Sequence, residues 1–83
     1  MEEELVGEVS HWFDNIKVAG IKLSEHLAVG DRVHIVGHTT DMEETITSMQ
    51  LDNENVTEAG PGDEIGIELT SRARPGDSIY KAS

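Results

Sequence analysis

Histidines and carboxylates are the residues of this 83-residue chain whose spacing suggests metal chemistry. His34 and His38 are followed closely by Asp41 and Glu43, and imidazole and carboxylate groups together can bind a metal ion. On an extended strand, however, four residues span ~13 Å, whereas an ion holds its ligands at ~2 Å. Only a bend at Gly37 would bring the two histidines closer. We therefore expect no metal site, with His34 on a strand face and His38 in a loop.

Catalytic chemistry lacks its usual sequence signals. The chain has no cysteine, and none of its serines lies in a motif that marks an activated hydroxyl. Paired carboxylates need one acid that burial keeps neutral, but the runs 2–4 and 41–44 are typical of solvated surface. We expect no enzymatic activity, no catalytic residue and no cofactor.

One tryptophan is a candidate for contact with a partner. Trp12 and Phe13 are neighbours at the end of an expected strand, so they point to opposite faces. Phe13 continues the alternation of Leu5 and Val9, which predicts that Phe13 lies in the core and Trp12 outside. An outward tryptophan can anchor a binding partner, or it can cover the end of a barrel.

Two polar segments supply the other candidates. Residues 38–41 are dense in hydrogen-bonding groups, and loops on rigid β scaffolds often carry recognition, although Thr and Asp are also ordinary turn formers. Arg72 and Arg74 project alike in an extended segment, where they either balance acids such as Glu68 and Asp77 or contact a phosphate. The candidate partner-binding residues are Trp12, His38, Thr39, Thr40, Asp41, Arg72 and Arg74.

The elements that must position these side chains are strands launched by a repeated turn. A Gly-Asp pair followed by alternating side chains occurs at residues 30–35, 62–67 and 76–81. Glycine reaches backbone angles closed to other residues, and aspartate can hydrogen-bond its own backbone just beyond the turn. The strands expected are residues 5–13, 16–23, 32–36, 43–51, 56–58, 64–70 and 79–82, with a bulge or a barrel corner at Gly20. The pattern predicts an all-β fold, a six- or seven-stranded antiparallel Greek-key barrel.

Length and charge limit the possible functions. We expect one domain over residues 1–83, with an acidic, disordered start at residues 1–4, in a chain that buries only ~60–65% of its unfolded surface. There is no apolar run long enough to span a bilayer and no secretory signal, which indicates a cytoplasmic protein without a membrane partner. The net charge of −11 opposes binding to DNA and disfavours RNA. The acidic groups either keep the domain soluble or face a basic protein partner.

Longer segments resemble two known groups of barrels. The segments 17–20, 27–37, 58–67 and 74–77 resemble the second domain of translational GTPases such as elongation factor Tu. Residues 37–41, with Ser48-Met49-Gln50, look closer still to the C-terminal barrel of the collagenase-like peptidases, some of which are tied to tRNA uridine hydroxylation. Both resemblances imply a translation-factor type of β-barrel.

The resemblance also shows what the chain lacks. The phosphate loop Gly-x-x-x-x-Gly-Lys-Ser/Thr is missing, so GTP binding is not implied. Ser48 stands where elongation factor Tu has a glutamate in its pocket for the terminal adenosine of tRNA. We expect a stand-alone, non-catalytic binding module that docks onto a protein or ribonucleoprotein in translation or tRNA metabolism. The alternatives are an accessory barrel of a separately encoded RNA-modifying or collagenase-like peptidase enzyme, and a direct tRNA or rRNA binder.

Overall fold

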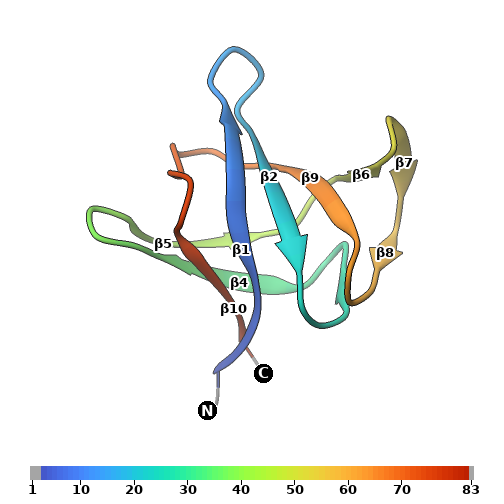
Figure 1. Ribbon diagram of the computed structural model, residues 1–83, viewed down its shortest axis with the longest axis horizontal. Coiled ribbons are helices and arrows are strands. Elements are labelled where there is room, and N and C mark those ends of the chain that lie inside the picture. Colours follow the sequence, from blue (N-terminus) through green and yellow to red (C-terminus); the bar gives the residue numbers. More distant parts are fainter. Residues whose placement is uncertain (1–2, 83) are drawn as a thin grey trace.

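The computed structural model describes residues 3–82, and Figure 1 shows their arrangement as strands joined by turns and loops. Over this range the chain forms ten strands and no helix, which confirms the all-β prediction. The strands are β1 (Glu3–Phe13), β2 (Val18–Leu23), β3 (Leu27–Ala28), β4 (Arg32–Val36), β5 (Asp41–Thr45), β6 (Met49–Leu51), β7 (Glu54–Val56), β8 (Glu58–Ala59), β9 (Glu64–Glu68) and β10 (Ser78–Ala82). No helix of the described residues is long and apolar enough to cross a membrane.

Eight of these strands form one antiparallel sheet that curls around the core. Their order is β5-β4-β10-β1-β2-β9-β6-β7, and β3 pairs with β8 separately. The edge strand β5 is tied to the far side of the sheet, because the Thr70 hydroxyl just beyond β9 donates a hydrogen bond to the Glu44 carboxylate. This arrangement is a small, barrel-like domain, and closure of this kind protects sheet edges.

Three turns of the same geometry launch β4, β9 and β10. In each turn the glycine has a φ of 89° to 96°, which fits the third position of a type II turn. The aspartate N–H donates to the carbonyl of the residue three positions earlier, and the aspartate carboxylate accepts the N–H of that same residue. The carboxylate bonds are Ala28 N to Asp31 Oδ2 at 2.9 Å, Gly60 N to Asp63 Oδ2 at 3.0 Å and Arg74 N to Asp77 Oδ2 at 2.8 Å. The aspartates thus bond back across the turn, and not beyond it as the sequence predicts.

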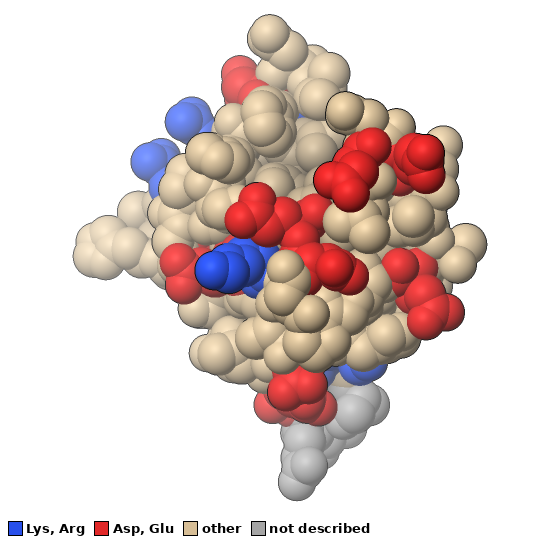
Figure 2. All heavy atoms as spheres, turned by 45° about the vertical axis from the view of Figure 1, so that its right-hand side comes forward, with Lys and Arg blue, Asp and Glu red and all other residues tan. Residues whose placement is uncertain are grey.

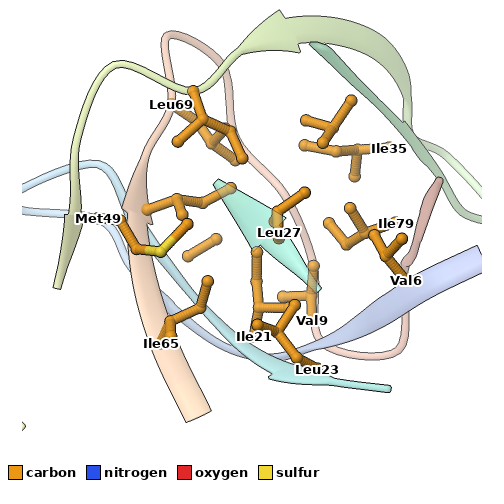
Figure 3. Packing of buried hydrophobic residues seen from close by; sticks show 14 of the residues in the cluster. Val6, Val9, Ile21, Leu23, Leu27, Ile35, Met49, Ile65, Leu69 and Ile79 are labelled. Carbon is orange, nitrogen blue, oxygen red and sulfur yellow. The ribbon is translucent and has the colours of Figure 1, made fainter. Parts of the chain in front are cut away.

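The core is filled by aliphatic side chains from nearly every strand (Figure 3). The alternation predicted after the first two Gly-Asp turns is confirmed, because Val33 and Ile35 are buried on β4 and Ile65 and Ile67 are buried on β9. Each such side chain contributes about 1.5–3 kcal/mol through burial. This packing determines which face of each strand is exposed to solvent.

The alternation along β1 differs from the prediction. Ser10 is an extra residue, because the pairing with β2 passes from Val9 to His11 with a shift in register. A bulge of this kind reverses the faces of the residues that follow it. Trp12 therefore packs against the core and Phe13 is 50% exposed, so the two predicted orientations are wrong.

The bulge predicted at Gly20 thus lies on the partner strand, since β2 itself alternates regularly with Ala19 and Ile21 buried. The predicted strand 43–51 is divided into β5 and β6, because Ile46 exchanges backbone hydrogen bonds with the Gly30-Asp31 turn. The predicted strand 56–58 is divided into β7 and β8. These two divisions, together with the short strand β3 where the sequence predicts none, explain why the described residues form ten strands.

The two ends of the described chain lie side by side (Figure 1). Glu3 and Glu4 on β1 pair with Ala82 and Lys81 on β10. Of the start predicted to be disordered, residues 1–2 lie outside the described residues, whereas Glu3 and Glu4 are ordered members of a strand.

Candidate functional site

Two of the segments predicted to contact a partner meet at one end of the sheet. Val36 on β4 is opposite Ser78 on β10, so the turn 37–40 and the loop 69–77 emerge together. Gly37 lies directly against the Asp77 carboxylate, which is only 4% exposed. A methyl group on Gly37 would sit 1.8 Å from Asp77 Oδ1, so the two loops can approach only because residue 37 has no side chain.

The predicted residues of the first loop serve different purposes in the fold. His38 and Thr39 are exposed, whereas Thr40 is buried and its carbonyl accepts the Gly37 N–H at 2.7 Å. Asp41, at the start of β5, bonds to His34. Of these four residues, Thr40 alone is buried, and Asp41 remains exposed beside its bond to His34.

The other predicted residues lie apart from that turn or beside it. Arg72 and Arg74 are exposed on either side of the buried Ala73, as the extended segment predicts. Among residues 3–82, no carboxylate lies within 4.0 Å of either guanidinium. Trp12 is half-buried near the β1–β2 hairpin, where its indole N–H donates to Asp14 Oδ1 at 3.1 Å. Their roles in binding stay predictions.

The structure brings His34 together with carboxylates from two other strands. When the imidazole is protonated, Nε2 donates to Asp41 Oδ1 at 2.6 Å and Nδ1 donates to Glu3 Oε2 at 3.0 Å. The hydrogen bond to Asp41, followed by the one to Glu3, raises the pKa of His34 above its ordinary 6.5. This contact joins β1, β4 and β5 on the outer face of the sheet.

The same cluster has the donor types of a metal site. Donor atoms of Glu3, His34 and Glu43 lie within 4.8 Å of one another. His38 is not part of this group, so the pairing of histidines considered in the sequence is replaced by a cross-strand group. Glu43 already accepts from Arg32 at 3.0 Å, and both ring nitrogens of His34 already face carboxylates. We interpret the cluster as a link between strands.

A groove on the opposite part of the sheet was not anticipated. A cross-strand row on the outer face runs His11, Gly20, Gly66 and Gln50, across β1, β2, β9 and β6. Gly20 and Gly66 are directly paired, so the middle of the row carries no side chain of its own and is bordered by the side chains of Val18 and His11. The hollow above it has a volume of about 420 Å³. We call it the glycine groove.

The two sides of the glycine groove differ in chemistry. One side carries Phe13 and Ile16, which are 50% and 62% exposed, and the His11 ring lies 6.1 Å from the Phe13 ring. The other side carries Asp52 and Glu64, among polar groups of β6, β9 and the β6–β7 turn. The sequence held one signal of this groove: a glycine falls between two buried residues in each of β2 and β9.

Acidic groups dominate the adjoining surface. Figure 2 brings the side with β6, β7, β8 and β9 forward and shows Asp and Glu spread over it, with few Lys or Arg between them. The whole chain has 17 Asp and Glu against six Lys and Arg. The surface is therefore suited to a positively charged partner.

Comparison with known proteins supports the fold. No family model matches the chain. A protein of Methanocaldococcus jannaschii described as an uncharacterized protease is 36% identical over 76 residues, which cover 90% of this chain and 19% of that protein. The chain thus spans about a fifth of the length of this curated relative.

Two solved structures share the architecture. Both are of the C-terminal domain of a putative U32 peptidase from Geobacillus thermoleovorans, one of them as a selenomethionine variant. They match with TM-scores of 0.89 and 0.90 at 17% identity, and cover 94% and 96% of this chain and 99% and 93% of theirs. The fold of the collagenase-like peptidase barrel is therefore the one found here, while the resemblance to elongation factor Tu stays a prediction.

Proposed function

We propose that this chain is a non-catalytic accessory barrel that recognises a partner on behalf of a larger protein of the U32 peptidase kind. The observation that carries this proposal is the match between 94% of this chain and 99% of a solved C-terminal peptidase domain. That solved chain consists almost wholly of the same barrel. The relative from M. jannaschii is about five times longer, which leaves ample length outside the barrel for a catalytic centre.

The arrangement of titratable groups supports a binding role. His34 and its carboxylate neighbours form a cross-strand link on an outer face, where 24% of the His34 side chain is exposed. A general acid or base works best in a closed site where burial tunes its pKa. The aspartates of the three Gly-Asp turns are likewise engaged with backbone N–H groups.

The partner we propose is a protein, free or within a ribonucleoprotein of translation or tRNA metabolism. A net charge of −11 repels phosphate groups at long range and attracts basic protein surfaces. Direct binding of tRNA or rRNA is the less favoured alternative. It would depend on the few exposed cations, chiefly Arg72 and Arg74.

Affinity purification of the tagged chain from its native cells tests the proposal. We expect a specific protein in stoichiometric amount, either a U32-type protein or a ribonucleoprotein component, that binds the chain again after both are purified. In parallel, the chain alone is incubated with gelatin and fluorogenic peptides, and titrated with tRNA at 50 and 200 mM salt. Hydrolysis by the isolated chain would refute the accessory role, and tRNA binding that weakens steeply with salt would favour the alternative.

A further inference from the structure

We propose that the glycine groove binds a positively charged segment of a protein partner and holds one apolar side chain of that segment against Phe13 and Ile16. This inference rests on the proposed function and names the surface through which it acts.

The floor of the groove admits close approach. The neighbours of Gly20 and Gly66 in sequence, such as Ala19 and Ile67, are buried, so positions 20 and 66 face outward. Neither carries a side chain, so the floor is lower at these two positions, although the Val18 side chain borders Gly66 and the His11 side chain borders Gly20. Glycine in a strand interior weakens the strand, and it often marks a place where a ligand or another backbone comes close.

The apolar side supplies the anchor. Phe13 is 50% exposed and Ile16 is 62% exposed, although both belong to residue types that are usually buried. The His11 ring, tilted at 48° to that of Phe13, extends the aromatic surface along the groove. A leucine- or phenylalanine-sized side chain would cover these groups and remove their apolar surface from water.

The charge selects a basic segment. The charged residues that line the groove are Asp52 and Glu64, and of these Glu64 is paired across the sheet with Lys22 on β2. A second hollow, of about 470 Å³, is lined by Lys22 as well as Glu8 and lacks this single sign. An apolar side chain flanked by Lys or Arg would therefore complement the groove, whereas RNA or a second copy of this acidic chain would be repelled.

Three short fluorescent peptides serve as probes: Lys-Arg-Leu-Arg-Lys, the same peptide with Ser at its centre, and Glu-Glu-Leu-Glu-Glu. Fluorescence anisotropy gives their affinities for the 83-residue chain at 50 and 200 mM salt. We expect the basic peptide with leucine to bind at least tenfold tighter than either control, and to weaken as salt rises. Amide chemical shifts in the ¹⁵N-labelled chain should move at Gly20 and Gly66.

Matched variants locate the contact. Phe13→Ser and Glu64→Gln should each weaken the basic peptide about five- to tenfold. Leu5→Ser changes an equally exposed residue outside the groove, and Glu4→Gln removes an exposed charge there, so neither should alter affinity. Circular dichroism and the dispersion of amide signals show that each variant is folded.

Equal binding of the leucine and serine peptides, shifts confined to other parts of the sheet, or loss of binding in Leu5→Ser would overturn the inference. So would the absence of any shift at millimolar peptide. If the purified partner still binds Phe13→Ser and Glu64→Gln with full affinity, the groove is refuted while the accessory role stands. Hydrolysis of the peptides by the chain would instead refute the accessory role.

Discussion

Replacement of Gly37 by alanine should destabilise the domain strongly, for a reason visible in one contact. The new methyl group would sit 1.8 Å from Asp77 Oδ1, whereas an ordinary contact begins at 3.4 Å. The carboxylate must therefore retreat by about 1.6 Å, the difference between these two distances. Asp77 Oδ2 accepts the Arg74 N–H at 2.8 Å, so this movement breaks the bond that closes the third Gly-Asp turn.

The expected loss of stability follows from the broken hydrogen bond and from the steric overlap. A buried hydrogen bond to a charged group contributes about 1.5–3 kcal/mol, and overpacking costs about 1–3 kcal/mol. We expect Gly37→Ala to lower the free energy of unfolding by about 3–5 kcal/mol, out of roughly 4–12 kcal/mol for a domain of this length. The midpoint of thermal unfolding should fall by roughly 15–30 °C.

Urea and thermal unfolding monitored by circular dichroism measure this effect, with Gly60→Ala as the control. A methyl group on Gly60 would meet no atom within 4 Å and needs no positive φ, so this variant should be neutral or stabilised by about 0.4–1 kcal/mol. In an Asp77→Ala background, Gly37→Ala should cost less than about 1 kcal/mol. A cost that is the same with and without the Asp77 carboxylate would refute the contact as the cause.

Three further predictions concern a proton, a turn and the core. Because hydrogen bonds raise the folded pKa of His34, the stabilisation by its protonated ring is complete below about pH 6.5 and is lost as the pH rises through the raised value. The difference in unfolding free energy between the wild type and His34→Gln should therefore be smaller at pH 8.5 than at pH 5.5. Asp41→Asn should weaken this dependence of the unfolding free energy on pH. Gly62→Ala should cost about 1–2 kcal/mol in urea unfolding through its φ of 89° alone, because a methyl group there meets no atom within 4 Å, and a larger loss would point to an unseen contact. Ile35→Ala should cost about 2–5 kcal/mol and Ile16→Ala less than about 0.5 kcal/mol, and similar costs at the two sites would contradict the packing described above.

The parts of the fold that the sequence predicts are those set by local chemistry. The Gly-Asp turns recur because glycine alone reaches the required φ without strain, and the strands β4 and β9 follow them with the expected faces. The observed β4 spans the predicted residues 32–36. Local turn chemistry and strict alternation were sufficient in these places.

The predictions about side-chain orientation and strand bounds are wrong where they depend on pairing with another segment of the chain. Phe13 and Trp12 exchange faces because Ser10 is an extra residue relative to β2, and this shift is defined by the pairing of the two strands. Ile46 leaves the strand pattern because its backbone pairs with a turn 15 positions earlier. The glycine groove is of the same kind, since Gly20 and Gly66 form a floor only once β2 lies beside β9.

The binding roles of the candidate residues stay predictions, and the structure shows where their side chains lie. The turn 37–40 and the loop 69–77 do meet, but Thr40 is largely buried and Asp41 is bonded to His34. His34, considered for a metal with His38, is instead linked to Glu3, 31 positions away in the chain. Contacts over such separations depend on the order of strands in the sheet, which spacing along the chain does not contain.

The pairing of Glu3 with Ala82 places both ends of the described chain at the same end of the barrel. Any polypeptide joined to residue 3 or to residue 82 departs from one spot, while the β1–β2 hairpin projects at the other end of Figure 1. A tethered barrel would thus be held by its base and would present Phe13 and Ile16 outward. Ends that lie close together also permit circular permutation. A variant in which the two ends are linked and the chain is opened in the exposed β6–β7 turn should therefore keep the same fold.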